Sequence, residues 1–407
     1  MFQDMGDSER PFEGVRILDF TRYFAGPVGT FQLALLGADV IKVESIEGED
    51  LRYDQLASKE WGDRGMSPGF LAVNGNKRSL AIDLRQSKGI EVVKRLAKNV
   101  DVVWENFRPG VMDQLGLGYT MLREANPGLI YCAVTGFGQT GPEKYTAAFD
   151  GKVQAMSGMM SLNGEPEQGP MRVGLPACDL IGGLTSAFAV SSALYQRTRT
   201  GRGQFVDVAM LDATLSALMA PNIVEYTVTG HVQKQYGNLS VSNKPTSDRF
   251  RCGDGYIMLA AVREKHFVNL MRILGREDVL DDSRFKDWSS RRKNARLLRE
   301  IIETAMANST PTIWEERLTK ADVPCATIHT IDQIVAHPQL QRRNILQRVE
   351  SRFGPLTLVG SGFELAYGTG RIKQPPPQLG EHTEKILIDA GYSLGDVGRL
   401  REAGIIL

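Results

Sequence analysis

Two aspartates, Asp150 and Asp179, are the residues of this 407-residue chain that are best suited to nucleophilic chemistry. Asp179 lies just after Pro176 and starts a long apolar pattern, with Gly182 and Gly183 one turn further on. These small neighbours leave room for a ligand, and a helix N-terminus would keep the carboxylate ionised, as a nucleophile requires. Asp150 occupies a second predicted helix start. The alternative for both residues is a structural helix cap, because Asp is preferred at that position.

Other common catalytic constellations are missing from the sequence. It contains no GxxxxGK[ST] phosphate loop, no HExxH zinc motif and no GxSxG nucleophile elbow, and its four cysteines form no CxxC pair. Residues 136–141 have the GxGxxG spacing of a dinucleotide site, but Pro142 stands where that motif's helix should already be running. We therefore predict no metal site, and we interpret residues 136–141 as a glycine-rich turn or as a loop whose backbone lies close to a ligand.

Basic and amide side chains gather near the ends of several predicted strands. On a chain without net charge they could form a pocket for a polyphosphate ligand with an aromatic part, or they could form an ordinary salt-bridged surface. These residues are Arg22, Lys42, Asn76, Arg78, Asn106, Phe107 and Arg108.

The elements that must position these residues alternate between short apolar strands and helical patterns. Such alternation indicates an α/β fold with a parallel sheet, and ligands of such sheets bind at the carboxyl ends of the strands. The predicted strands are 14–20, 38–44, 79–84, 100–104, 129–134 and 204–208, and the predicted helices are 29–36, 87–99, 149–160 and 180–197.

The sequence changes character near residue 225. Residues 250–259 have the pattern of a β-hairpin with an Asp-Gly turn, and charge-rich amphipathic helices follow between 264 and 320. This stretch is typical of a smaller second domain. Beyond residue 335, strand-like segments return at 345–349 and 356–359.

Composition limits the classes of partner. The 48 basic and 48 acidic residues cancel, which argues against nucleic acid or an anionic membrane as the main partner and is compatible with self-association. The chain starts with a polar, acidic segment, has no apolar run of 18 residues and uses few cysteines. We therefore expect no secretory signal, no membrane span and a cytoplasmic location.

Taken together, the motifs resemble the class III CoA-transferase family, the group that includes formyl-CoA transferase and carnitine CoA-transferase. The resemblance covers nearly the whole chain, and it depends on the order and spacing of many short pieces rather than on any single one. The matching pieces are 18–22 with 25–27, 36–44, 76–79, 105–110, 136–142, Asp179 with Gly182 and Gly183, 200–204, and 375–382.

The resemblance implies a Rossmann-like large domain built from residues 1–224 and 335–407, a small α+β domain of residues 225–334, and an interlocked homodimer. It implies a reaction that moves CoA from an acyl-CoA donor to a carboxylic acid through an aspartyl anhydride and an aspartyl-CoA thioester. Asp179 matches the nucleophile, and Asp150 matches a supporting polar position. The CoA thioester is a substrate in this scheme, and no permanently bound cofactor is expected.

The resemblance also implies which residues line the site. The CoA contacts would be Arg22, Lys42, Asn76, Arg78, Asn106, Phe107 and Arg108. The substrate pocket would include Phe24, Gly138, Gln139 and Phe149.

Two departures from the family pattern affect the expected substrate. Relatives that act on oxalate carry Gln at the position of Phe24. Those relatives also cover the site with a run of glycines, whereas the corresponding residues 236–242 of this chain contain one glycine. We therefore expect an acyl group larger than oxalyl.

Two alternatives to transfer remain open. The 2-methylacyl-CoA racemases also resemble this chain, but their catalytic His falls on Phe149, which cannot move a proton. A non-catalytic CoA-binding protein is the other alternative, and the presence of Asp179 argues against it.

Overall fold

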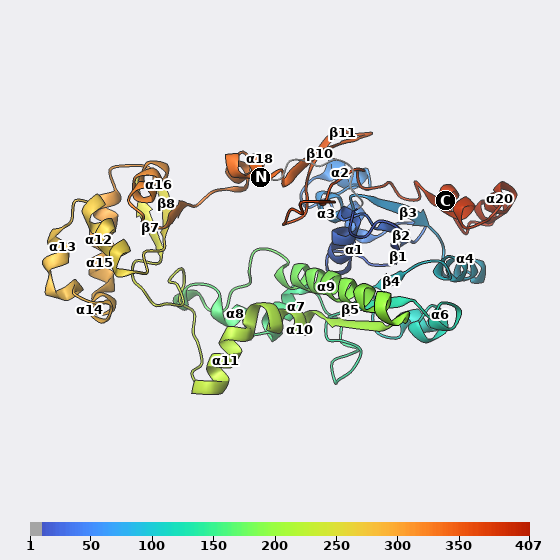
Figure 1. Cartoon of the computed structure of the whole chain (residues 1–407), viewed down its shortest axis with the longest axis horizontal. Helices are drawn as coiled ribbons and strands as arrows, with labels where there is room; N and C mark the ends of the chain where they lie inside the picture. The colour runs from blue at the N-terminus through green and yellow to red at the C-terminus, as the bar shows by residue number, and fades with distance from the viewer. Residues whose placement is uncertain (1–9) are drawn as a thin grey trace. The chain divides into compact units, whose positions relative to one another are not determined.

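Six short strands form one parallel sheet in the order β3-β2-β1-β4-β5-β6 in the computed structural model, which describes residues 10–407 (Figure 1). This order confirms the predicted α/β class, and the predicted strands all form. The strands are β1 (Arg16–Asp19), β2 (Asp39–Glu44), β3 (Lys77–Ala81), β4 (Val102–Glu105), β5 (Ile130–Thr135) and β6 (Phe205–Ala209).

The chain divides into two compact units. The larger one consists of residues up to 158, residues 173–230 and residues 338–407, and the smaller one consists of residues 159–172 and 231–337. We predicted from the polar segment at the start of the chain that it carries no secretory signal, and residues 1–9 of that segment lie outside the described residues.

Helices cover both faces of the parallel sheet, as expected for crossover connections. On one face α1 lies beside α9, and α9 also packs against β5 and β6 (Figure 1). Apolar side chains of α4, α5, α6, α19 and α20 fill the core on the other face. The helices of this unit are α1 (Ala25–Leu35), α2 (Lys59–Asp63), α3 (Pro68–Val73), α4 (Ser87–Ala97), α5 (Val111–Gln114), α6 (Tyr119–Ala125), α7 (Asp150–Met156), α9 (Ala177–Thr200), α10 (Met210–Thr214), α11 (Ala220–Thr229), α18 (Pro338–Arg343), α19 (Thr383–Asp389) and α20 (Leu394–Glu402).

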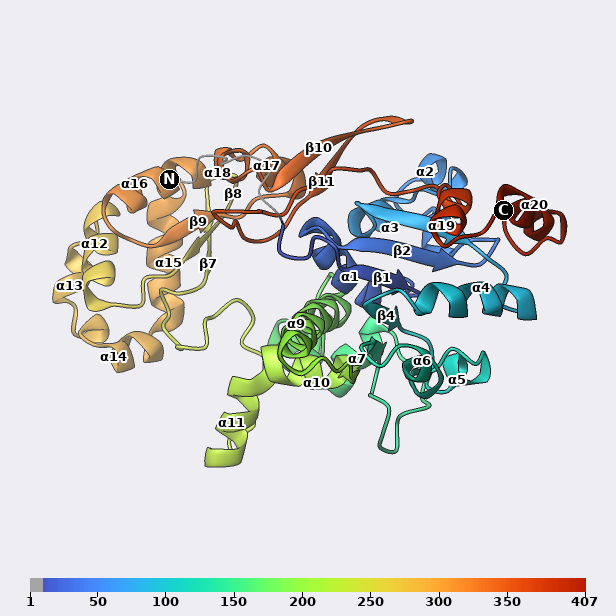
Figure 2. The ribbon, with the colours of Figure 1, turned by 45° about the vertical axis from the view of Figure 1, so that its right-hand side comes forward.

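The C-terminal segment returns to the larger unit. The hairpin of β10 (Leu346–Ser351) and β11 (Gly354–Val359) contributes Val349 and Leu358 to a buried cluster with Phe31 and Phe70. Figure 2 shows α19 beside β3. The backbone N–H of Ala81 in β3 donates to the hydroxyl of Thr383 in α19, which lies 302 residues later in the sequence. The two ends of the described chain therefore build one core.

The smaller unit has an antiparallel three-stranded sheet, β7-β8-β9, packed against amphipathic helices. Its strands are β7 (Arg249–Cys252), β8 (Gly255–Leu259) and β9 (Cys325–Thr327). Its helices are α8 (Met159–Leu162), α12 (Glu264–Ile273), α13 (Asp278–Asp281), α14 (Trp288–Lys293), α15 (Ala295–Met306), α16 (Pro311–Lys320) and α17 (Ile331–Val335).

Several predicted boundaries were wrong, each for a local reason. Helix α1 begins at Ala25, not at residue 29, because Pro27 is tolerated in a first helical turn. The helix expected over 149–160 breaks at Gly158, which adopts a positive φ of 83°. In the β7–β8 hairpin, Cys252 pairs with Gly255, so the two-residue turn is Gly253-Asp254 rather than Asp-Gly. Gly253, with φ +46°, supplies the positive φ that this turn needs.

One helix among the described residues, α9, has the length and apolar composition of a membrane span. Eight of its residues are buried, including Gly182, Gly183 and Ala187. Because it packs on α1 and the sheet, α9 is a core helix of the larger unit.

Candidate active site

Asp150 holds the first turn of α9, the turn that carries Asp179. Its Oδ1 accepts hydrogen bonds from the backbone N–H groups of Cys178 at 2.7 Å and Asp179 at 3.3 Å. A helix start leaves its first N–H groups without partners in the helix, so a buried carboxylate there stabilises the turn. Both aspartates thus occupy the predicted helix starts, and Asp150 serves as a cap for the helix of the other.

Gln154 extends this arrangement and was not singled out from the sequence. Its side-chain amide donates to Asp150 Oδ2 at 2.6 Å and to the Leu175 carbonyl at 3.2 Å, and its Oε1 accepts from the Val173 N–H at 2.9 Å. Gln154 therefore fixes the segment that leads into Asp179. The available signal was its spacing of four residues from Asp150 in a predicted helix.

The Asp179 carboxyl is partly buried, and its environment disfavours the charged form. Burial first, and the nearby carboxylate of Asp150 second, raise the pKa of Asp179 to about 7. The helix N-terminus was expected to keep this group ionised, but burial and the neighbouring carboxylate oppose that effect. The adjacent Cys178 is fully buried, and burial raises the pKa of its thiol, so it stays neutral.

Helices α1 and α9 approach each other closely at two glycines. A Cβ at Gly183 would lie 2.7 Å from the Ala25 carbonyl oxygen, and a Cβ at Gly29 would lie 2.5 Å from the Ser186 hydroxyl oxygen. No larger residue fits either position without moving a helix. This contact brings the start of α1, and the loop that follows β1, close to the first turns of α9.

The loops after β1 and β4 meet at the point where the strand order reverses, which is the usual ligand-binding crevice of such sheets. The Arg22 N–H donates to Asn106 Oδ1 at 2.9 Å, and Asn106 Nδ2 donates back to the Arg22 carbonyl at 2.8 Å. The Arg22 guanidinium lies 5.1 Å from the centroid of the Phe107 ring. The structure thus brings together three of the seven residues predicted to contact CoA, and the exposed Arg108 directly follows them.

Aromatic side chains connect this crevice to the aspartates. The rings of Tyr23 and Phe149 pack edge to face, with centroids 6.1 Å apart, and 38% and 69% of the two residues are exposed. Phe149 directly precedes Asp150. Phe24, by contrast, packs partly buried against the cluster that includes Leu51.

The loop after β5 carries the remaining predicted pocket residues. The Gly138 N–H donates to the Thr135 hydroxyl at 2.9 Å, and Gly138 has a positive φ of +82°. The Gln139 N–H donates to Asp207 Oδ2 at 3.0 Å. A Cβ at Gly136 would meet the Ala148 side chain at 2.1 Å. No helix lies between β5 and α7, a stretch that the structure describes in full, so residues 136–141 form a glycine-rich turn and not the opening of a dinucleotide-binding helix.

Lys42 and Asn76, both predicted to contact CoA, already have protein partners. The Lys42 ammonium is fully buried, lies 2.7 Å from Glu49 Oε1 and donates to the Thr21 carbonyl. Asn76 bonds the backbone of the returning C-terminal segment, donating to Arg371 at 2.6 Å and accepting from Lys373 at 2.7 Å.

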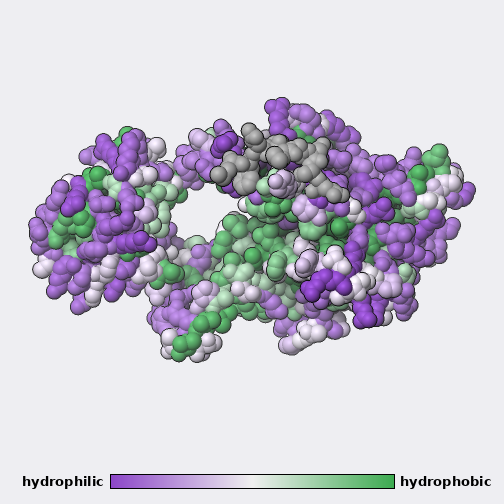
Figure 3. Space-filling view, in the orientation of Figure 1, coloured by the Kyte–Doolittle hydropathy of each residue, from purple (hydrophilic) through white to green (hydrophobic). Residues whose placement is uncertain are grey.

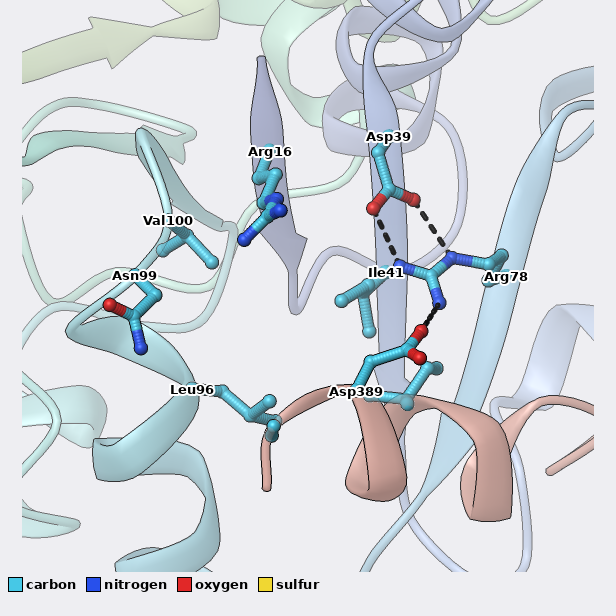
Figure 4. A pocket seen from close by; sticks show the side chains of 10 residues that line it. Arg16, Asp39, Ile41, Arg78, Leu96, Asn99, Val100 and Asp389 are labelled. Carbon is cyan, nitrogen blue, oxygen red and sulfur yellow. Dashed lines mark hydrogen bonds and ion pairs between the residues drawn. The ribbon is translucent and has the colours of Figure 1, made fainter. Parts of the chain in front are cut away.

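Arg78 lies at the opposite, amino edge of the sheet. Figure 4 shows its guanidinium between Asp39 and Asp389, in a pocket of about 380 Å³. It donates to both carboxylate oxygens of Asp39, at 2.8 and 2.6 Å, and lies 3.6 Å from Asp389. The structure therefore does not bring Arg78 together with Arg22, Asn106 and Phe107.

Comparison with known proteins identifies the family. The profile of CoA-transferase family III matches residues 12–383. The succinate–glutarate CoA-transferase of Agrobacterium fabrum is 35% identical over 395 residues, covering 95% of this chain and 97% of that protein. The succinyl-CoA:glutarate CoA-transferase of Homo sapiens is 33% identical over 405 residues, covering 98% and 90%.

Solved structures agree with this assignment. A CAIB/BAIF family protein from Brucella suis superposes with a TM-score of 0.86 at 34% identity, covering 94% of this chain and 100% of that one. Because the family model, the relatives and the fold agree, the chain belongs to CoA-transferase family III and is a CoA-transferase.

Proposed function

We propose that this enzyme moves CoA from an acyl-CoA donor to a carboxylic acid acceptor with Asp179 as the covalent nucleophile. The observation that carries the proposal is the position of Asp179 in the first turn of α9, with its backbone N–H bonded to the buried carboxylate of Asp150. A carboxylate can attack a thioester without a metal ion, and covalent capture retains the acyl-transfer potential of the thioester.

The proposed cycle has two halves. An Asp179 carboxylate oxygen attacks the thioester carbon, the C–S bond breaks, and CoA leaves as a thiolate with the bonding electron pair. The thiolate then attacks the aspartyl carbonyl carbon of the resulting anhydride, releasing the donor acid and leaving an aspartyl-CoA thioester. The acceptor carboxylate attacks the carbonyl carbon of this thioester and expels the CoA thiolate, which leaves an anhydride between Asp179 and the acceptor. The thiolate then attacks the acceptor carbonyl carbon, which forms the new acyl-CoA and regenerates the Asp179 carboxylate.

In this proposal the CoA end of the substrate lies at the crevice after β1 and β4. Arginine suits phosphate oxygens, and the Phe107 ring offers a face for the pantetheine or adenine part. Arg22, Asn106, Phe107 and Arg108 are the proposed contacts. Lys42, Asn76 and Arg78 act through the segments that they hold, because their side chains are already paired.

The acyl group would lie among Phe24, Gly138, Gln139 and Phe149. Succinyl-CoA as donor and glutarate as acceptor are the first substrates to test, because two relatives carry those names. Phe149 offers no group for proton transfer, so the proposed reaction is transfer and not racemization.

We propose a homodimer located in the cytoplasm. Large apolar side chains are exposed along two helices of the larger unit, and Figure 3 shows hydrophobic surface over this region. A second copy of the chain is the proposed cover for them. The free cysteines, Cys132, Cys178, Cys252 and Cys325, suit a reducing compartment. The exposed side chains are Leu184, Phe188 and Tyr195 on α9 and Ile223, Val224, Tyr226 and Val228 on α11.

A transfer assay with three variants tests the proposed nucleophile. Purified enzyme is mixed with succinyl-CoA and a panel of carboxylic acids, and new acyl-CoA is measured by mass spectrometry. Asp179→Ala and Asp179→Asn should lose transfer by at least about a thousandfold, since the nucleophile is gone. Asp212→Asn removes an exposed carboxylate at the start of α10 and should stay close to wild type.

Two results would overturn the proposal. One is substantial transfer by Asp179→Ala on several acceptors. The other is deuterium exchange at the acyl α-carbon in heavy water without any CoA transfer by the wild type.

A further inference from the structure

Side chains, rather than neighbouring backbone, hold the loop of residues 21–23 after β1. Asp19 accepts from the Thr21 N–H at 3.0 Å, and the Lys42 ammonium donates to the Thr21 carbonyl at 2.9 Å. Asn106 binds both the N–H and the carbonyl of Arg22. Five backbone groups of this loop have side-chain partners once the Tyr23 N–H is included.

The Tyr23 N–H donates to Glu49 Oε2 at 2.9 Å, and Glu49 Oε1 lies 2.7 Å from the Lys42 ammonium. The Lys42 side chain has no exposed surface, and 2% of the Glu49 side chain is exposed. A buried ion pair is expensive to desolvate and is often no more stabilising than a packed apolar pair. The stability of the fold therefore does not explain why these two charges lie beneath an active-site loop.

The surrounding charges keep Lys42 ionised. Burial alone would lower the pKa of Lys42, but Glu49, Asp19 and Glu44 together raise it above its ordinary value. The other charged groups at this site are already paired: Lys77 lies 3.0 Å from Asp19, and Arg52 lies 2.6 Å from Glu44. The Lys42 ammonium thus stays charged across the physiological pH range.

The consequence is visible at Tyr23, which has a φ of +60°. A non-glycine residue with a side chain of this size rarely adopts a left-handed conformation, and it persists only where the surroundings over-determine it. This conformation sets the Tyr23 ring edge to face with Phe149, the residue next to Asp150. The Tyr23 hydroxyl also donates to Asp50 at 2.8 Å.

We propose that Lys42 and Glu49 are positioning residues of this transferase, holding Tyr23 against Phe149 so that the two rings flank the acyl thioester in front of Asp179. The inference rests on the proposed function and adds two positioning residues and a specificity-determining one, Tyr23. A displaced ring would misplace the thioester carbon, and an error of about 1 Å can cost on the order of a hundredfold in rate.

Paired variants test the proposal. Lys42→Met with Glu49→Gln in one chain removes the ionic hold and leaves no unpaired charge, so it should fold. It should raise the half-saturating acyl-CoA concentration at least about tenfold. Tyr23→Asn tolerates the left-handed conformation but removes the ring, and it should have the same effect. Tyr23→Phe keeps the ring and loses the hydroxyl bond to Asp50, so it should raise the half-saturating concentration less than Tyr23→Asn does.

Arg291→Met with Glu264→Gln is the matched control, because this ion pair has a buried Arg291 side chain and belongs to the smaller unit, whereas residues 21–23 belong to the larger unit. A merely structural role would lower the melting temperature of this control and the double variant alike, without changing the half-saturating concentration of either.

The proposal is overturned if Tyr23→Asn binds and turns over acyl-CoA like wild type, or if a folded double variant does. If the double variant does not fold, the two Tyr23 variants decide alone. Labelling of Asp179 in the wild-type enzyme is measured alongside. Its absence would contradict the proposed function, whereas normal labelling with unaffected variants would contradict only the positioning role.

Discussion

The side-chain carboxylate of Asp150 accepts a hydrogen bond from the backbone N–H of Asp179, across 29 residues of sequence and a distance of 3.3 Å. One carboxylate thus orients the helix turn that carries the other, while its charge raises the pKa of that other group. Asp150 therefore contributes both to geometry and to the ionisation of Asp179.

Asp150→Asn should separate these two contributions. The Asn carbonyl still accepts from the Cys178 and Asp179 N–H groups, but the negative charge is gone. The acid limb of the pH–rate profile should move to lower pH by on the order of one unit, because the Asp179 carboxylate loses a repulsive neighbour. If the acid limb stays at the same pH, the charge of Asp150 does not affect the pKa of Asp179.

Asp150→Ala removes the acceptor as well as the charge. Loss of a helix cap should lower the free energy of unfolding by about 0.5–2 kcal/mol, measured by denaturant titration. Asp150→Asn serves as its comparison, since it retains the Oδ1 acceptor. Equal stability of the Ala and Asn variants would contradict the capping role.

Covalent capture of the acyl group should depend on pH around neutrality. The pKa of Asp179 is raised to about 7, first by burial and then by Asp150, and only its ionised form attacks a thioester. The single-turnover rate at saturating acyl-CoA should rise about tenfold per pH unit below 7 and level off above about 8. Stopped-flow measurement of thiolate release gives this rate, and a flat profile between pH 5 and pH 8 would be inconsistent with this environment.

Asp179→Asn should be more stable than wild type at pH 8. Because the folded-state pKa of Asp179 lies above its ordinary value of 3.8, its stabilising contribution is present at low pH and is lost as the pH rises through 7. Above pH 7 the folded wild type must hold a desolvated carboxylate, which Asn avoids. Allowing for partial exposure, the gain should be about 1–3 kcal/mol at pH 8 and smaller at pH 5. Thermal melts at both pH values measure it, and a larger gain at pH 5 would reverse the predicted sign.

The close approach of α1 and α9 predicts a cost for one methyl group. Gly183→Ala should destabilise the protein by about 1–3 kcal/mol, because its Cβ would lie 2.7 Å from the Ala25 carbonyl oxygen and from Val28 Cβ. Gly398→Ala, in α20 with nothing within 4 Å of the new Cβ, should instead stabilise by about 0.5–1 kcal/mol. The pair is compared by denaturant titration, and equal midpoints would refute the packing argument.

Local patterns were enough to predict the fold. Most strands of the sheet contain a short apolar run between helical patterns, although β3 begins with Lys77, Arg78 and Ser79. Such alternation leaves few possible topologies. The predicted helix boundaries were wrong where a single residue determines them. Pro27 lies inside the first turn of α1, and the positive φ of Gly158 ends a helix that was predicted to continue.

The site could be predicted only as far as local sequence determines it. The helix starts at Asp150 and Asp179 follow from neighbouring residues, but the cap that one forms on the helix of the other depends on folding across 29 residues. Likewise, nothing near Arg78 in the sequence indicates its pairing with Asp389, and nothing near Lys42 shows that its ammonium is buried against Glu49. Basic residues near strand ends look alike in sequence, whether they face a ligand or a buried carboxylate.

The most direct test of the account is to identify the residue that becomes covalently modified. The wild-type enzyme is incubated with succinyl-CoA, treated with hydroxylamine, digested and analysed by tandem mass spectrometry, with Asp179→Asn processed in parallel. If Asp179 is the nucleophile, a hydroxamate should appear on the peptide that contains Asp179, dependent on succinyl-CoA and absent from the variant. A hydroxamate on another carboxylate, or efficient CoA transfer with Asp179 unmodified, would contradict it.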